Sequence, residues 1–200
     1  MTAKIYVEGG GDNRDTIVRC KSGFAEYCKK VCPQNRRPAI VACGTRKDAF
    51  DRFKIAVEIS KSGEQSALLV DSEGPVNPKV APATFLHERD KWDFTQLPKN
   101  RVFLMVQAME AWFMADRSAL AEYYGEGFRV RALPSDELHI ESIPKDDLEP
   151  ALVNATRATK TKGEYHKTRH AFALLVAIDP DKVELGSPHA AAFNDFLRSL

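Results

Sequence analysis

The first 71 residues alternate between short apolar runs and longer segments with a helical spacing of apolar residues, and this order restricts the fold more than any other feature. The apolar runs are Lys4–Val7, Ala39–Ala42 and Ser66–Val70. Each of the two intervening segments places apolar residues three and four positions apart, which predicts an amphipathic helix. A strand–helix–strand–helix–strand order is typical of a parallel sheet with right-handed crossovers, so we expect an α/β fold.

The rest of the chain predicts a fourth strand followed by a mainly helical part. Residues 74–100 contain four prolines and predict a long loop with at most a short helix at 85–91. The other expected elements are a strand at 101–106, one or two helices within 108–124 divided near Asp116, a small strand at 128–132, and helices at 146–159, 165–178 and 188–200. We expect Trp112 to pack in the core rather than to stack on a nucleic-acid base.

Length and composition favour one globular domain. At 200 residues, with 44% apolar and 28% charged residues, the chain can bury a continuous core. We therefore expect a single Rossmann-like domain over residues 1–200, with a mainly parallel sheet of about four strands flanked by helices. Its core would span about residues 1–125, and a helical C-terminal extension would span about residues 145–200.

Charge, hydropathy and cysteine content exclude several classes of protein. The formal net charge of +1 is far below that of a dedicated DNA-coating protein. A signal peptide and a membrane span are both missing from the pattern, so we expect a cytoplasmic protein without a membrane partner. The four cysteines do not form a CxxC pair, which favours buried or inert thiols over a zinc site.

Acidic side chains follow two of the expected strands at the point where each strand ends. Glu8 comes directly after the first strand, and Asp71 and Glu73 come directly after the third. The carboxyl ends of parallel strands meet at one edge of a sheet, where ligands of such folds bind. Crowded carboxylates repel one another unless a cation neutralises them, so we expect Mg²⁺ or Mn²⁺ bound there. The alternative is that these acids only cap helices or solvate loops.

Two basic or glycine-rich segments could meet phosphate. The loop after the first strand contains Gly10 and Gly11, whose backbone amides can approach an anion closely, although the loop matches neither a P-loop nor GxGxxG. Residues 157–170 hold five Lys or Arg and a single acid, Glu164. That segment is either a phosphate-attracting stripe or a solvated helix face.

Two sequence blocks resemble the signature of the TOPRIM domain, which topoisomerases, bacterial primases and OLD-type nucleases share. The blocks are Val7-Glu8-Gly9 and Leu68-Leu69-Val70-Asp71-Ser72-Glu73. The resemblance implies that Glu8 is the proton-shuttling glutamate and that Asp71 binds metal. The family pattern is Asp-x-Asp, and Glu73 departs from it with a longer side chain of the same charge.

A longer series of blocks resembles a TOPRIM-like bacterial family labelled domain of unknown function 4276. The blocks are VEGGGD, Gly44-Thr45-Arg46, LLVDSEGPV, VQAMEAWFMAD, YHK and LLVAIDP, and they span nearly the whole chain. This resemblance implies an ABC-type ATPase partner, as in a split OLD-type nuclease, and a role in defence against phage. Within the pattern Glu110 could add a metal-binding carboxylate, while Arg46 and Lys167 could meet phosphate. Ordinary ion pairs are the alternative for all three.

The leading hypothesis from the sequence is a Mg²⁺-dependent endonuclease that cleaves nucleic-acid phosphodiester bonds, with DNA favoured over RNA as substrate. The alternative is a non-catalytic subunit that binds nucleic acid or regulates the ATPase. A nucleotide-handling phosphotransferase ranks below both because a recognisable nucleotide loop is missing. The sequence does not exclude a homodimer.

Overall fold

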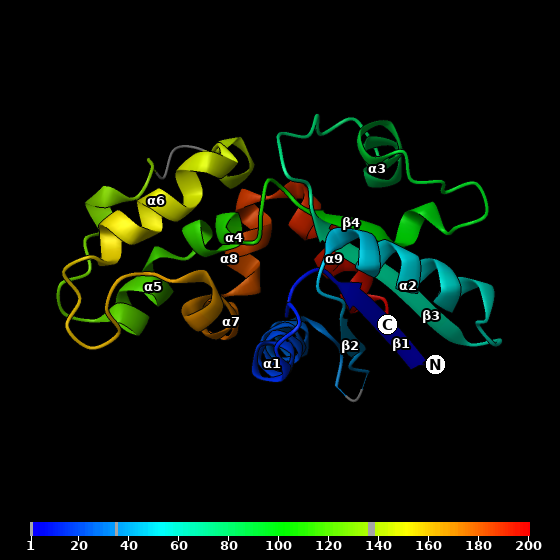
Figure 1. The fold of residues 1–200 in the computed structure, drawn as a ribbon, viewed down its shortest axis with the longest axis horizontal. Helices are drawn as coiled ribbons and strands as arrows, with labels where there is room; N and C mark the ends of the chain where they lie inside the picture. The colour runs from blue at the N-terminus through cyan, green and yellow to red at the C-terminus, as the bar shows by residue number, and fades with distance from the viewer. Residues whose placement is uncertain (1, 35, 136–138) are drawn as a thin grey trace.

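A computed structural model of the protein describes residues 2–34, 36–135 and 139–200, and it contains a four-stranded parallel sheet (Figure 1). The strand order is β2-β1-β3-β4, and each neighbouring pair is parallel. The strands are β1 Thr2–Val7, β2 Ala39–Ala42, β3 Glu64–Asp71 and β4 Val102–Met105. The expected α/β class, sheet direction and number of strands are confirmed.

Helices flank the sheet and form the whole C-terminal part. They are α1 Arg14–Val31, α2 Arg46–Glu58, α3 Pro82–Asp90, α4 Glu110–Ala115, α5 Arg117–Tyr124, α6 Lys145–Thr156, α7 Lys167–Ala177, α8 Pro180–Gly186 and α9 Pro188–Arg198. Three short 3₁₀ helices cover Lys99–Arg101, Val130–Ala132 and Ile140–Ser142. None of the helices described is both long and apolar enough to pass through a membrane.

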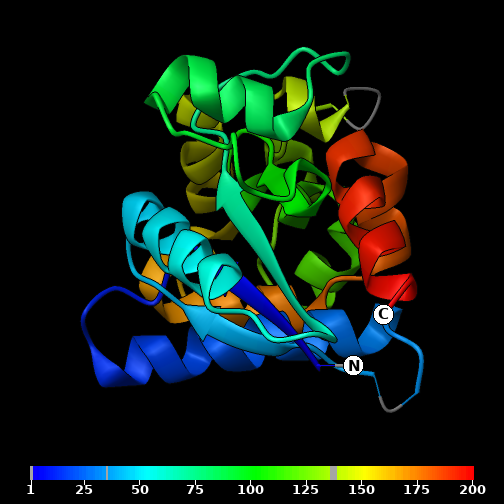
Figure 2. The same cartoon turned by 90° about the vertical axis from the view of Figure 1, so that its right-hand side faces the viewer.

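Alternate residues of the central strands belong to two separate apolar cores, one on each face of the sheet. Val7 and Leu69 pack with α1, α7 and α9, whereas Leu68 and Val70 pack with α2 and α3. This is the two-residue period of a strand that is buried on both faces. Figure 2 shows α1 and α2 on opposite sides of the sheet.

The C-terminal helices share the first of these cores with the sheet. Phe193 and Leu197 of α9 are fully buried in the same cluster as the residues of α1. Trp112 lies among them, with its ring stacked on Tyr27 at 5.0 Å between centroids, so its role is packing, as expected. The described cysteines are free thiols, and burial raises the pKa of all four, which agrees with the expectation of inert thiols.

Local structure differs from the sequence-based expectations at three places. Residues 128–132 form a loop and a 3₁₀ turn instead of a strand, because Arg129 donates its backbone N–H to Ala155 at the end of α6 at 2.8 Å rather than to the sheet. The helix expected at 85–91 begins earlier, with Pro82 in its first turn. Helix α8 was missed, although Asp179 followed by Pro180 is a typical helix start.

Candidate functional site

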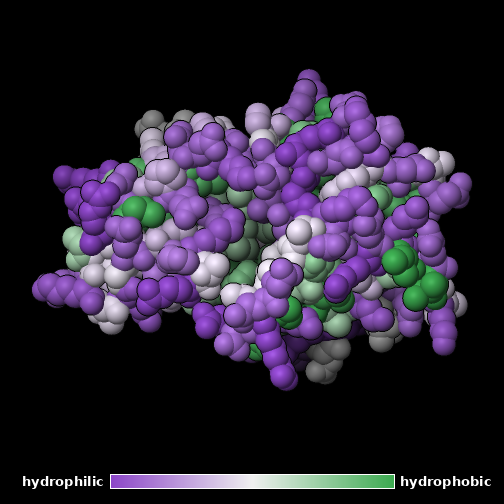
Figure 3. Space-filling model, viewed as in Figure 1, coloured by the Kyte–Doolittle hydropathy of each residue, from purple (hydrophilic) through white to green (hydrophobic). Residues whose placement is uncertain are grey.

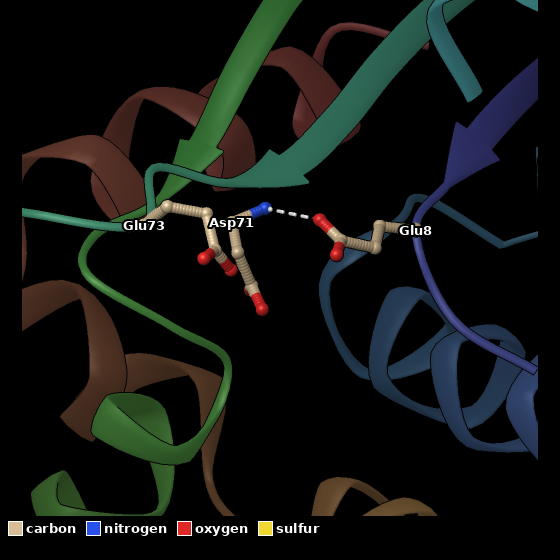
Figure 4. Close-up of side chains that lie close together, drawn as sticks. All are labelled: Glu8, Asp71 and Glu73. Atoms are coloured by element: carbon tan, nitrogen blue, oxygen red, sulfur yellow. Dashed lines mark hydrogen bonds between the residues drawn. The ribbon is translucent and has the colours of Figure 1, made fainter. Parts of the chain in front are cut away.

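The three acids expected to lie together at the carboxyl edge of the sheet do so (Figure 4). Glu8 follows β1, Asp71 ends β3, and Glu73 lies two residues further on. One carboxylate oxygen from each residue lies within 4.8 Å of the others. The register explains this convergence: Val7 pairs with Leu69, and Asp71 pairs with Met105, so β1, β3 and β4 end at one edge.

Backbone hydrogen bonds fix two of these carboxylates. The N–H of Asp71 donates to Glu8 Oε2 at 3.1 Å, which ties the end of β3 to the residue after β1. The N–H of Met109, just before α4, donates to Asp71 Oδ1 at 2.9 Å. Both side chains are thereby held with one oxygen engaged, which leaves the other oxygen of each available to a ligand.

Glu73 reaches the site from an unusual backbone conformation. Its φ angle is 63°, in the left-handed region that non-glycine residues seldom adopt. Its N–H donates to the carbonyl of Gln107 at 2.9 Å, which holds the turn against the segment after β4. Backbone strain of this kind concentrates at functional sites. Lys145 at the start of α6 forms an ion pair with the Glu73 carboxylate.

Burial and repulsion from neighbouring carboxylates raise the pKa of Glu8 and of Asp71. Burial, together with the nearby charge of Glu73, raises the pKa of Glu8 to about 7, although the Asp71 amide and Arg46 act in the opposite direction. Burial raises the pKa of Asp71 well above its usual value, and the carboxylates of Glu8 and Glu110 add to this effect. Groups that repel one another in this way are stabilised by a cation.

Glu110 lies next to the three acids but is already paired. It is buried at the start of α4, where Tyr165 donates its hydroxyl to Oε1 at 3.1 Å. The ammonium group of Lys167 lies 3.1 Å from the same oxygen. Burial alone would lower the pKa of Lys167, but the charges of Glu110 and Asp71 outweigh it and raise this pKa. Lys167 is therefore a stable cation beside the carboxylates.

Arg46 lies beside the acids in a fixed position. Its Nε donates to the backbone carbonyl of Asp71 at 2.9 Å and lies 3.7 Å from Glu8 Oε2. Its two terminal nitrogens donate to both oxygens of Asp90 at 3.0 and 2.9 Å. The guanidinium carbon lies 5.3 Å from the centre of the Trp92 ring. These contacts make Arg46 a clamp that holds the end of β3, with its donors used inside the protein.

Three partners of the site were not found from the sequence, namely Lys145, Tyr165 and Asp90. Tyr165 lies in the YHK block, and this position was the only hint in the sequence of its role. Lys145 and Asp90 have other charged residues as sequence neighbours, so the sequence does not indicate their partners in the folded protein.

A cavity of about 280 Å³ opens beside the acids, between the strand ends and α7. Gly10 and Gly11 line it with Glu8, Asp71 and Lys167. Gly10 has a φ angle of 88°, and a Cβ there would lie 3.2 Å from the backbone of Ile17, so a side chain would be strained. On the surface shown in Figure 3, a hollow lies near the centre, with hydrophobic side chains at its base.

The basic segment 157–170 does not act as one stripe. Arg157 and Lys160 form ion pairs at exposed positions. Arg157 Nε lies 3.8 Å from Glu164 Oε2, and Lys160 Nζ lies 2.7 Å from Glu126 Oε1. His170 is buried with structural hydrogen bonds to Tyr124 and to the backbone of His166. Most of the basic side chains in this segment therefore fit the solvated face, whereas Lys167 reaches the site.

The donor set suits a hard divalent cation. Oxygens bound to one octahedral Mg²⁺ lie at most about 4.2 Å apart, given Mg–O distances near 2.1 Å. The 4.8 Å spread of Glu8, Asp71 and Glu73 is slightly larger than this limit, so small side-chain rotations or an intervening water would be needed to complete a site. The cation would replace the Lys145 ammonium as the partner of Glu73. The geometry of the three acids and the raised pKa values of Glu8 and Asp71 thus fit Mg²⁺ or Mn²⁺.

Comparison with known proteins gives one match. A family model described as Domain of unknown function (DUF4276) matches residues 7–198. Curated proteins and solved structures gave no match. Because the matched region covers nearly the whole chain, including every residue of the site described above, the protein belongs to the DUF4276 family.

Proposed function

We propose that this protein is a Mg²⁺- or Mn²⁺-dependent nuclease of the TOPRIM type that cleaves nucleic-acid phosphodiester bonds, with DNA favoured as substrate. One observation carries the proposal: Glu8, Asp71 and Glu73 each place a carboxylate oxygen within 4.8 Å of the others at the edge of a parallel sheet. Such acids suit a metal that also holds a substrate phosphate.

The residues of the chain have distinct roles in this proposal. A bound Mg²⁺ would polarise a phosphoryl oxygen. Glu8, which corresponds to the proton-shuttling glutamate in the TOPRIM resemblance, would transfer a proton as a general acid or base. The Lys167 ammonium would offset negative charge that develops on the phosphate. Helix α7 begins at Lys167, so its positive N-terminal end also favours an anion here.

The resemblance to split OLD-type nucleases adds a partner to the proposal. It implies that the chain acts with an ABC-type ATPase in defence against phage. The sequence blocks alone support this partnership, and we propose that the site acts within such a complex. Copurification of the tagged chain with an ATPase encoded beside it would test the partnership.

Cleavage assays test the central proposal. The purified protein is incubated with plasmid DNA, single-stranded DNA and RNA in Mg²⁺, Mn²⁺ or EDTA, alone and with the ATPase. We expect cleavage in either metal, none in EDTA, and a loss of at least about 100-fold in Glu8→Gln and Asp71→Asn. Glu126→Gln is the matched control, because its side chain is 77% exposed, pairs with Lys160 and does not line the cavity. Unchanged cleavage in Glu8→Gln and Asp71→Asn would refute the proposal.

A second candidate is a non-catalytic subunit that binds nucleic acid or regulates the ATPase. The pairing of Arg46 with Asp90 and of Glu73 with Lys145 favours it, because these side chains are already engaged within the protein. In this case the reconstituted complex would bind nucleic acid or change the ATPase rate without cleaving. Metal-dependent cleavage by the complex that is lost in Asp71→Asn would exclude this candidate.

A further inference from the structure

The cavity beside the acids is lined by two chemically different sets of side chains. One set is polar and includes Glu8, Asp71 and Lys167. The rest of the lining includes the apolar side chains of Met105, Met109, Ala171 and Phe172. Metal and phosphate chemistry alone does not require this apolar part, so the cavity fits a ligand with an anionic end and a flat apolar end.

Phe172 forms an aromatic surface in the apolar part of the lining. It lies on α7, and its ring is close to Gly9, where an added Cβ would be 3.7 Å from the ring edge. Helix α1 approaches the same residue at Gly23, where a Cβ would lie 2.9 Å from the carbonyl oxygen of Phe172. The absence of side chains at both glycines lets α7 pack closely, which holds the Phe172 backbone in place. Phe172 is partly buried and lines the cavity, and an aromatic ring in such a position is a suitable stacking surface.

The size of the cavity limits the ligand. Its volume of about 280 Å³ is at the low end of small-molecule sites, which span roughly 300–1,000 Å³. This volume accommodates one ring system with its attached sugar and excludes a base pair in a duplex. Enzymes that hold a single base in such a pocket act on single strands or extrude the base from the helix.

We infer that the apolar part of the lining, formed by Met105, Met109, Ala171 and Phe172, receives one unpaired nucleobase, next to the phosphate held at the carboxylates. This inference rests on the proposed function for the substrate class and deepens it, because it makes the substrate a single strand or a strand with an extruded base. Phe172 is the stacking residue. A duplex without an unpaired base is a poor substrate.

Two small probes test the base site separately from cleavage. Binding of adenosine monophosphate and of ribose 5-phosphate, which lacks the base, is measured by calorimetry in Mg²⁺. We expect adenosine monophosphate to bind at least about tenfold more tightly, because base–aromatic stacking supplies an effect of this size. Phe172→Ala should abolish most of this preference, whereas Phe172→Tyr should keep it. Val176→Ala is the matched control, since Val176 lies on the same helix and is 39% exposed.

The outcomes separate this inference from the proposed nuclease function. Equal affinity for the two probes, or a base preference that survives in folded Phe172→Ala and Phe172→Leu, overturns the base site, even if metal-dependent cleavage occurs. Base preference that depends on Phe172, without cleavage of any nucleic acid, supports the base site and refutes the nuclease. If both hold, an oligonucleotide series with one abasic position will show slower cleavage when the missing base is the one beside the scissile phosphate.

Discussion

Replacing Glu8 by glutamine should stabilise the metal-free protein while removing its response to metal. Glutamine keeps the shape of the side chain, and its amide oxygen can still accept the hydrogen bond from the Asp71 N–H, which is 3.1 Å long in the native protein. The substitution removes one of three carboxylates whose oxygens lie within 4.8 Å of one another. The variant thus loses repulsion and burial of a charge, but keeps the contact that joins the ends of β1 and β3.

The size of the gain follows from the pKa of Glu8, which burial and the charge of Glu73 raise from 4.5 to about 7. At 1.36 kcal/mol for each pH unit, this difference corresponds to about 3.4 kcal/mol as an upper bound. Because 21% of the side chain is exposed and Arg46 lies 3.7 Å away, we expect about 1–3 kcal/mol at pH 8. The folded protein binds this proton more tightly than the unfolded chain does. The native protein therefore loses stability as pH rises from about 4.5 to 7, and the advantage of the variant falls below about 1 kcal/mol at pH 5.

Urea denaturation followed by tryptophan fluorescence measures this effect, because Trp92 and Trp112 are both buried. In EDTA at pH 8, Glu8→Gln should have the higher free energy of unfolding. With Mg²⁺ at ten times its dissociation constant, the native protein should gain about 1.4 kcal/mol, and the variant should gain little. If Glu8→Gln is less stable than the native protein in EDTA at pH 8, or responds to Mg²⁺ equally, the carboxylates are not a repulsive metal site.

Three further substitutions test other parts of the structure. Lys167→Met should lower the rate of the proposed metal-dependent cleavage by about tenfold or more, since it removes the cation that pairs with Glu110 beside the acids; an unchanged rate in the folded variant would exclude this role. Asp116→Asn should lower the free energy of unfolding by about 1–2 kcal/mol at pH 7. Although burial opposes ionisation, hydrogen bonds from Lys182 and other donors lower the pKa of Asp116 to about 2. The loss of stability in the variant should therefore disappear as the pH falls from about 4 towards 2. Urea titrations across this pH range measure the difference between the two proteins, and a constant difference would contradict the reasoning. Gly127→Ala should destabilise the folded protein by at least about 2 kcal/mol, because the φ angle of Gly127 is 93° and a Cβ would lie 2.1 Å from the carbonyl oxygen of Ala158. Thermal unfolding measures this loss, and equal unfolding midpoints for the two proteins would contradict the prediction.

The sequence was sufficient to predict the sheet and the position of the acids because both depend on local patterns. Apolar runs mark β1, β2, β3 and β4, and the ends predicted for these four strands lie within two residues of the observed ends. Parallel strands then require Glu8 and Asp71 to meet at one edge, although more than sixty residues separate them. The rule that parallel strands end at one edge of a sheet therefore predicts this contact without any information on long-range contacts.

The partners of the acids could not be predicted because they depend on how loops and C-terminal helices pack. Lys145 reaches Glu73 from α6, and Tyr165 reaches Glu110 from the segment before α7. Charged residues on a helix surface look alike in sequence whether or not they face a site. The expected strand at 128–132 failed for a related reason, since a backbone hydrogen bond to α6 decided its conformation.

The cavity is assembled from both ends of the chain. The acids come from the first half, whereas Lys167, Ala171 and Phe172 come from α7. A fragment ending near residue 125 would keep every carboxylate of the centre but would lack the part of the lining that α7 supplies and much of the apolar core that supports the sheet. A fragment that ends near residue 125 should therefore lose ligand binding and folding together.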